Sequence, residues 1–218
     1  MMEFNDLIEQ AKKVFDQRTA VRDQALVHAR QLTRLSAHTI RAIHRDEVDE
    51  AEKMLIEARV LTLNIQRDLA SYPDVYFAGY TQDAIKEFAE ANLTVALIRN
   101  QPMPAPEDLG IEYAPYLNGL AETIGELRRK CLDILRQGYS EDAERLLNTM
   151  DEIYNVLVTM DYADAITNGL RRQTDLVRGI IERTRADLTL SLREQHLQEA
   201  LQNFSEKFPG MKDLSLPD

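Results

Sequence analysis

Apolar residues recur along most of the chain at intervals of three and four positions rather than two, which is the spacing of one face of an α-helix. Glycine and proline, which interrupt helices, are few and clustered. The pattern predicts an all-α fold, a single-domain bundle of six or seven helices over residues 1–204, followed by an irregular tail over residues 205–218. The expected helices cover approximately residues 5–44, 46–70, 81–99, 116–137, 140–157 and 162–202.

Residues that start or stop helices divide these segments. Asp46, Thr81 and Ser140 are the predicted N-caps of three of the helices, because short polar side chains accept a hydrogen bond from the first helical turn. Gly138 is expected to end one helix, and Asn168 with Gly169 marks a break near the start of the last. The loop between the third and fourth helices contains prolines.

Composition narrows the class of protein. The 218 residues are 44% hydrophobic and carry a net charge of −11, which argues against indiscriminate adhesion to nucleic acid or membranes, although a local basic face can still bind phosphate. The single cysteine, Cys131, excludes an internal disulfide framework, and its apolar helix position predicts a buried thiol. No apolar run approaches the length of a membrane span, so we expect a soluble cytoplasmic protein with no membrane partner.

Two glutamates on the third predicted helix are the first candidates for chemistry. Glu87 and Glu90 lie one turn apart, and residues 91–98, which follow them, carry no charge. Like charges at the edge of a packed interior repel each other and lose hydration, so they are stable there only with a partner, and a divalent cation is one such partner. The alternative is that both are solvated and that Lys86 pairs with Glu90.

A second pair, Glu122 and Glu126, lies on one face of the next predicted helix. Facing helices that each present a carboxylate pair are the arrangement in which bundles hold metal ions. Oxygen ligands favour Mg²⁺ or Mn²⁺ over zinc, and neither the cysteine nor the four histidines show a zinc spacing. In the alternative interpretation, Glu126 pairs with Lys130 and Glu122 is an ordinary solvent-facing residue.

Basic residues form a stripe along the first predicted helix and recur every seven residues along the last. Such a stripe could follow a phosphodiester backbone, and the alternative is a solvated face or a set of salt bridges between subunits. The candidate nucleic-acid-binding residues are Arg30, Arg34, His38, Arg41 and Arg45 on the first helix and Arg171, Arg178 and Arg185 on the last.

Three segments carry a resemblance to the translin family. Residues 87–91, Glu-Phe-Ala-Glu-Ala, are similar to the Glu-Tyr-Val-Glu-Ala helix of the family's catalytic branch, the TRAX (translin-associated factor X) subunits. Residues 119–129 resemble the family's helix ending in Gly-Glu-Leu-Met-Arg or Ser-Glu-Leu-Ser-Arg, and residues 32–45 resemble its Leu-Ser-Arg-Asp-Ile-Thr region, which ends in His-Arg. A basic segment of the non-catalytic branch is absent at residues 77–83, which favours the TRAX branch.

The resemblance implies a bundle of about seven helices that assembles into a closed octameric shell and binds single-stranded RNA or DNA. It implies that Glu87 and Glu90 match two catalytic, metal-binding glutamates, that Glu122 falls where TRAX has its catalytic aspartate, and that Glu126 matches the glutamate four residues later. Because Glu122 is one methylene longer than aspartate, its geometry toward a metal ion differs from that of the family.

The leading hypothesis is therefore a Mg²⁺- or Mn²⁺-dependent endoribonuclease that cuts single-stranded or flexible RNA inside a homo-octameric shell of the prokaryotic type. Glu87, Glu90 and Glu122 would ligate the metal, and Glu126 would be a further ligand, an orienting group or a general base. The alternative is a non-catalytic shell that binds single-stranded DNA or RNA, and a third class is a helical scaffold without nucleic acid. Apolar residues near the end of the chain are expected to be covered by neighbouring subunits: Phe204, Phe208, Met211, Leu214 and Leu216.

Overall fold

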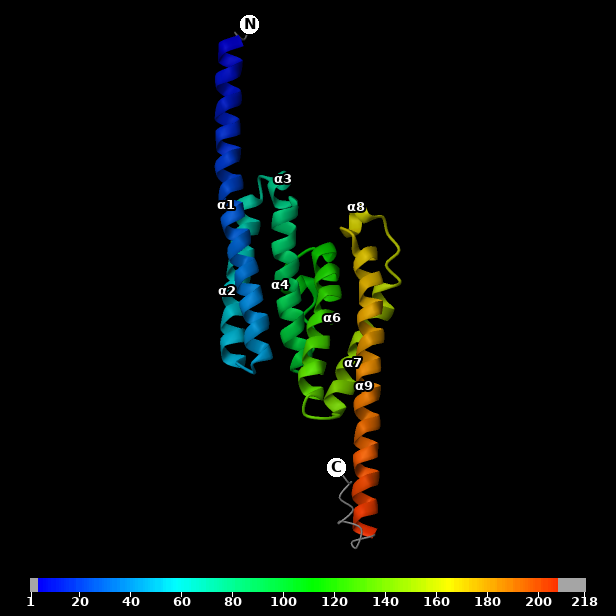
Figure 1. Cartoon of the computed structure of the whole chain (residues 1–218). Helices are drawn as coiled ribbons and strands as arrows, with labels where there is room; N and C mark the ends of the chain where they lie inside the picture. Colours follow the sequence, from blue (N-terminus) through cyan, green and yellow to red (C-terminus); the bar gives the residue numbers. More distant parts are fainter. Residues whose placement is uncertain (1–3, 208–218) are drawn as a thin grey trace, which may run out of the picture.

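A computed structural model describes residues 4–207 of the chain, and within that range every regular element is a helix (Figure 1). The predicted all-α fold is confirmed. Three single-turn helices lie in the connections: α3 (Pro73–Tyr76), α5 (Pro106–Leu109) and α8 (Asp164–Thr167). The long helices are α1 (Phe4–His44), α2 (Val48–Leu69), α4 (Gly79–Ile98), α6 (Tyr113–Leu135), α7 (Glu141–Leu157) and α9 (Leu170–Lys207).

Helices α4 and α6 form the centre of the bundle. The α1–α2 hairpin packs against α4 on one side, and α7 and α9 pack against α6 on the other (Figure 1). The uncharged segment of α4 is buried on most sides, and Phe88 of α4 and Ile124 and Leu127 of α6 are fully enclosed. The apolar side chains at the centre of the contact between α4 and α6 are therefore shielded from water by the helices on both flanks.

The two central helices approach closely at Gly119 of α6. A Cβ atom at this position would lie 2.8 Å from the main-chain oxygen of Lys86, 2.9 Å from the Cβ of Ala89 and 3.0 Å from the main-chain nitrogen of Glu90. Real Cβ contacts are not this short, so only glycine allows the two backbones to lie at this separation. The close approach brings Glu122, which lies almost one turn after Gly119, next to the glutamates of α4.

Several predicted helix ends are confirmed. Ser140 is the N-cap of α7, and its Oγ accepts a hydrogen bond of 3.2 Å from the main-chain N–H of Asp142. Gly138 follows the end of α6 with a φ of 112°, a conformation that glycine adopts readily. Asn168 and Gly169 both have positive φ and separate α8 from α9, so the predicted break is present.

Two predicted N-caps are wrong. The N-cap of α2 is Glu47, and Asp46 lies in the turn before it. Asp46 has a φ of 60°, a left-handed conformation that this tight turn requires and that aspartate tolerates. Thr81 lies inside the first turn of α4, which begins at Gly79, and its hydroxyl donates to the main-chain oxygen of Val75 at 3.0 Å. The predicted loop also extended too far, because α6 already begins at Tyr113, and a proline in a first turn loses no intrahelical hydrogen bond.

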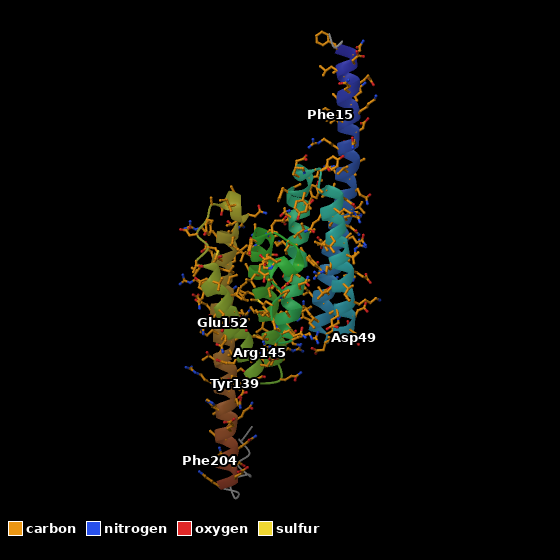
Figure 2. All side chains as sticks on the ribbon, turned by 180° about the vertical axis from the view of Figure 1, so that it is seen from behind. Phe15, Asp49, Tyr139, Arg145, Glu152 and Phe204 are labelled. Atoms are coloured by element: carbon orange, nitrogen blue, oxygen red, sulfur yellow. The ribbon has the colours of Figure 1, made fainter. Side chains whose placement is uncertain are left out.

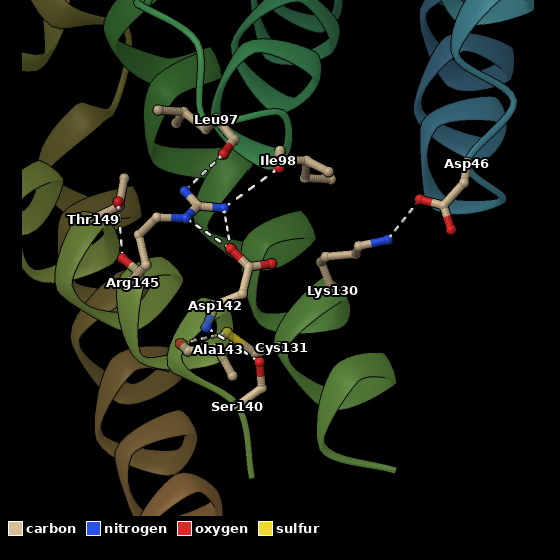
Figure 3. Close-up of polar contacts among 10 residues, drawn as sticks. All are labelled: Asp46, Leu97, Ile98, Lys130, Cys131, Ser140, Asp142, Ala143, Arg145 and Thr149. Atoms are coloured by element: carbon tan, nitrogen blue, oxygen red, sulfur yellow. Dashed lines mark hydrogen bonds and ion pairs between the residues drawn. The ribbon is translucent and has the colours of Figure 1, made fainter. Parts of the chain in front are cut away.

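Polar contacts fasten the ends of α4 and α6 to their neighbours (Figure 3). Arg145 of α7 donates to the main-chain oxygens of Leu97 at 3.1 Å and Ile98 at 3.4 Å, which satisfies carbonyls that the end of α4 leaves without a helical partner. Lys130 of α6 forms an ion pair of 3.0 Å with Asp46, which anchors α6 to the turn between α1 and α2. Both contacts lie at the end of the bundle where α4 and α6 finish, so that end of the central pair is tied to α7 and to the α1–α2 turn.

Helices α1 and α9 extend past the bundle at opposite ends (Figure 1). Residues 4–20 of α1, the N-terminal overhang, are all exposed except Ala11, and residues 189–207 of α9, the C-terminal overhang, include no buried residue. Figure 2 labels Phe15 on the first and Phe204 on the second. Of the apolar residues expected to be covered near the end of the chain, only Phe204 lies within the described residues. Exposed apolar side chains of the two overhangs are Phe4, Leu7, Ile8, Val14 and Phe15 on α1 and Leu190, Leu197, Leu201 and Phe204 on α9.

No helix within residues 4–207 combines the length and the apolar character that crossing a membrane requires. The predicted bundle ended at residue 204, whereas α9 continues to Lys207. The remainder of the predicted tail, residues 208–218, lies outside the described residues.

Candidate metal centre

Three glutamates meet at the seam between the central helices. Glu87 and Glu90 come from α4 and Glu122 comes from α6, and one carboxylate oxygen of each lies within 4.8 Å of the others. Hard oxygen donors at this separation suit Mg²⁺ or Mn²⁺ better than softer metals. We call these three residues the triad.

Glu90 is the most enclosed member of the triad. It is 8% exposed, and within residues 4–207 no side-chain hydrogen bond or ion pair reaches its carboxylate. Burial, together with the negative charges of Glu87 and Glu122, raises the pKa of Glu90 to about 8. A buried carboxylate without a partner is costly unless it binds a proton or a cation, so the donor set fits a divalent ion.

Lys86 is the positive group beside the triad. Its Nζ donates to Glu122 Oε1 at 2.8 Å and lies 3.6 Å from Glu87 Oε1, so the alternative pairing with Glu90 is wrong. Burial raises the pKa of Glu87, and the charge of Lys86 opposes that shift. Gln173 of α9 donates to the same Glu122 Oε1 at 2.9 Å. A third helix therefore contributes to the arrangement of the triad.

Glu126 lies one turn beyond Glu122 and has a partner of its own. The Nε2 atom of His44, the last residue of α1, lies 2.6 Å from Glu126 Oε2, and this hydrogen bond lowers the pKa of Glu126 although burial opposes it. The alternative pairing of Glu126 with Lys130 is wrong, because Lys130 pairs with Asp46. The charge of Glu126 also contributes to the raised pKa of Glu90, so Glu126 acts on the triad electrostatically.

Sequence reasoning missed three of these neighbours as parts of the site. The side chain of His44 is 2% exposed, and its Nδ1 is buried without a hydrogen-bond partner within the described range. Its position beside Arg45 in a family-like segment was the only available signal. Lys86 was considered only as a partner of Glu90, and nothing in the pattern around Gln173 pointed to the triad.

Cys131 behaves as the sequence predicted. Its thiol is fully buried in α6 and lies 3.5 Å from the main-chain oxygen of Ala143, and burial raises its pKa to about 11. A thiol with a raised pKa is a poor nucleophile.

The basic stripe on α1 is exposed along its whole length, and no ion pair or side-chain hydrogen bond within residues 4–207 engages it. On α9, Arg171 is likewise exposed and has no ion-pair partner among residues 4–207. Arg178 pairs with Glu182 at 3.1 Å, and Arg185 pairs with Asp151 at 2.6 Å. The four arginines of the stripe thus have no neutralising partner within residues 4–207, and two of the three candidates on α9 are partly neutralised. The five stripe residues are Arg30, Arg34, His38, Arg41 and Arg45.

Comparison with known proteins places this bundle in a defined class. Its fold is that of the C3PO proteins: the structure superimposes on AfC3PO with a TM-score of 0.79 and 32% identity, over 86% of this chain and 97% of that one. A second AfC3PO structure, a complex with duplex RNA, gives a TM-score of 0.79 and 34% identity with the same coverage. Apo-NeC3PO, at 22% identity and a TM-score of 0.78 over 88% of this chain and 99% of that one, supports the fold alone.

Sequence comparison extends this result. An uncharacterized protein of Methanocaldococcus jannaschii is 35% identical over 187 residues, which cover 84% of this chain and 81% of that protein. No family model matches the chain. The chain belongs to the translin family.

Proposed function

We propose that this protein is a Mg²⁺- or Mn²⁺-dependent endoribonuclease of the TRAX type, in which Glu87, Glu90 and Glu122 hold the metal. The observation that carries the proposal is the side chain of Glu90, a residue only 8% exposed, which lies beside two other carboxylates and has no hydrogen-bond or ion-pair partner within residues 4–207. Three acidic side chains so arranged destabilise the fold unless a cation compensates them, and proteins tolerate such an arrangement chiefly where it has a function.

The triad residues have distinct parts in this proposal. When bound, the metal ion supplies an activated water and stabilises negative charge on the phosphate. Glu90 provides the innermost oxygen, and the close approach at Gly119 sets its separation from Glu122. Glu126 stays ionised because His44 binds it, so it can orient the attacking water or accept its proton at the edge of the triad.

Binding of RNA is assigned to the stripe on α1. Arg41 and Arg45 flank His44 in sequence, and the ring of His44 contacts Glu126, one turn beyond Glu122 of the triad. A backbone that follows the stripe would bring a phosphate to the metal centre. The complex of AfC3PO with duplex RNA supports the assignment of RNA as the ligand, and we propose single-stranded or flexible RNA as the substrate.

Assembly completes the proposal. The two overhangs expose apolar side chains that a closed oligomer would bury, and the family resemblance specifies eight copies. In such a homo-octamer an acidic exterior and a basic, RNA-binding interior could coexist in one chain of net charge −11.

A second candidate is a shell that binds single-stranded DNA or RNA without cutting it. The ion pairs that Lys86 forms with Glu122 and Glu87 favour this candidate, because they compensate part of the negative charge without any metal.

Cleavage of labelled single-stranded RNA at increasing Mg²⁺ or Mn²⁺ separates the two. Glu90→Gln keeps the size of the side chain and removes its charge, so we expect the cleavage rate to fall at least about a hundredfold. Glu57 of α2 is exposed and has no hydrogen-bond or ion-pair partner among residues 4–207. Glu57→Gln is therefore the matched control and should cut at the parental rate. Parental cleavage by Glu90→Gln and Glu122→Gln would refute the metal site, and salt-sensitive RNA binding without cleavage at any metal concentration would favour the second candidate.

A further inference from the structure

Lys86 competes for an oxygen of the triad. A carboxylate oxygen has about two lone pairs, and Glu122 Oε1 already accepts hydrogen bonds from Lys86 Nζ at 2.8 Å and from Gln173 Nε2 at 2.9 Å. A divalent ion of the size of Mg²⁺ lies about 2.0–2.1 Å from each ligand oxygen. Glu122 Oε1 can therefore become a ligand only if one of these two donors leaves, and a divalent ion held by Oε2 of the same carboxylate would still lie close to the ammonium and repel it.

The donor that leaves should be the ammonium group. Gln173 is neutral, whereas Lys86 carries a positive charge that a divalent ion between Glu122 and Glu87 would repel. The side chain of Lys86 is 19% exposed, and its ammonium is carried on a flexible four-carbon stem, so the ammonium can move outward to solvent.

From this geometry we infer that Lys86 is the resident counter-ion of the metal-free triad and that a divalent cation displaces it from Glu122. The inference rests on the proposed metal site and goes beyond it, because it makes Lys86 the residue that sets metal affinity. The ammonium stabilises three crowded carboxylates when no metal is present, and the same contacts oppose metal entry. Its removal should tighten metal binding, whereas loss of an ordinary structural salt bridge would misplace Glu122 and weaken it.

The first experiment titrates Mn²⁺ into the full-length protein and measures free Mn²⁺ by electron paramagnetic resonance, with no RNA present. Lys86→Met should bind Mn²⁺ about tenfold more tightly than the parent. Lys53→Met removes an exposed charge from α2 that pairs with no residue among 4–207. It changes the net charge equally, so its Mn²⁺ affinity should stay within about twofold of the parent. Lys86→Arg keeps the positive charge and should not gain affinity.

The second experiment observes the displacement in the unaltered protein. Brief acetylation with and without Mg²⁺, read by mass spectrometry, reports how accessible each lysine amine is. Reactivity of Lys86 should rise several-fold with Mg²⁺, and that of Lys53 should not change.

Unchanged or weaker Mn²⁺ binding by a folded Lys86→Met variant would overturn the inference. Acetylation of Lys86 that does not change when Mg²⁺ is added would also overturn it. If Lys86→Met does not fold, the acetylation result decides alone. Because neither experiment contains RNA, the inference and the proposed nuclease fail separately. A protein in which Mg²⁺ releases Lys86 but which cuts no RNA refutes only the nuclease.

Discussion

The close approach of α4 and α6 predicts that Gly119→Ala damages the metal centre. The added methyl would meet the main-chain oxygen of Lys86 and the main-chain nitrogen of Glu90, and backbone atoms cannot rotate away as a side chain can. The helices must therefore separate, and they carry the triad ligands on both sides of this contact.

The magnitude follows from two opposing effects. Alanine stabilises a helix interior by about 1 kcal/mol relative to glycine, and overpacking costs about 1–3 kcal/mol, so the free energy of unfolding should fall by up to about 2 kcal/mol. Gly125→Ala is the matched control, because Gly125 lies in the same helix and a Cβ there would meet nothing within 4 Å. It should gain about 1 kcal/mol, and the difference of about 1–3 kcal/mol between the two variants isolates the steric effect.

Urea unfolding of the metal-free protein measures both stabilities, and a Mn²⁺ titration measures the site. Divalent ions of this class demand near-ideal geometry, so Gly119→Ala should lose at least about tenfold in Mn²⁺ affinity, whereas Gly125→Ala should keep it. If Gly119→Ala matched Gly125→Ala in stability and bound Mn²⁺ as the parent does, the argument that this glycine sets the separation of the triad would be refuted.

Three further expectations concern protons, phosphate and assembly. Glu90 has a pKa of about 8 in the folded chain against a reference of 4.5, so the folded state binds the proton more tightly than the unfolded state. The stability of the metal-free protein should therefore fall as pH rises from 4.5 through 8, over the interval in which metal affinity rises. Thermal melts of chelator-treated protein test this, and an equal dependence of the melting temperature on pH in Glu90→Gln would contradict it. Arg34→Ala should weaken binding of single-stranded RNA and reduce the salt slope by about one, whereas Arg59→Ala on α2 should change neither; an unchanged slope in Arg34→Ala would remove the stripe from the interface. Light scattering at micromolar concentration should give a particle of about 200 kDa, eight copies of the 25.0 kDa chain, and a monomer or dimer would rule out the enclosed site.

Local patterns predicted the helices well, and the caps less well. Ser140 was predicted correctly because its cap is made with Asp142, two residues along the chain. Asp46 was predicted wrongly, because its carboxylate pairs with Lys130, 84 residues away, instead of capping the helix. Its backbone adopts a left-handed conformation that aspartate tolerates, and the local sequence gives no signal of this. Helix spacing reports which face is buried, whereas the choice of the first helical residue depends on contacts between helices.

The candidate site divides in the same way. The spacing of one helical turn predicted that Glu87 and Glu90 lie on the same side of their helix. The second carboxylate pair, on the next predicted helix, predicted that Glu122 lies near them. The other contacts connect residues far apart in sequence: His44 reaches Glu126 across 82 residues, and Gln173 reaches Glu122 across 51. Lys86 had a glutamate available one turn away on its own helix, but it pairs with one on the facing helix, since tertiary packing sets which carboxylate its ammonium can reach.

The N-terminal overhang has a thermodynamic consequence of its own. Most helical stability in proteins comes from tertiary packing, and within the described range the only side-chain hydrogen bonds and ion pairs between residues 4–20 and residues outside α1 are those of Gln17 with Tyr72 and Arg18 with Asp74. In the proposed octamer, their helical order would draw on the neighbouring copies that cover Phe4, Leu7 and Val14. In amide hydrogen exchange this segment would become protected only as chains associate, at a protein concentration set by the association constant, while amides around Leu32 would stay protected throughout. One continuous helix would thus carry two stabilities, with its first turns reporting assembly and its last turns reporting the fold.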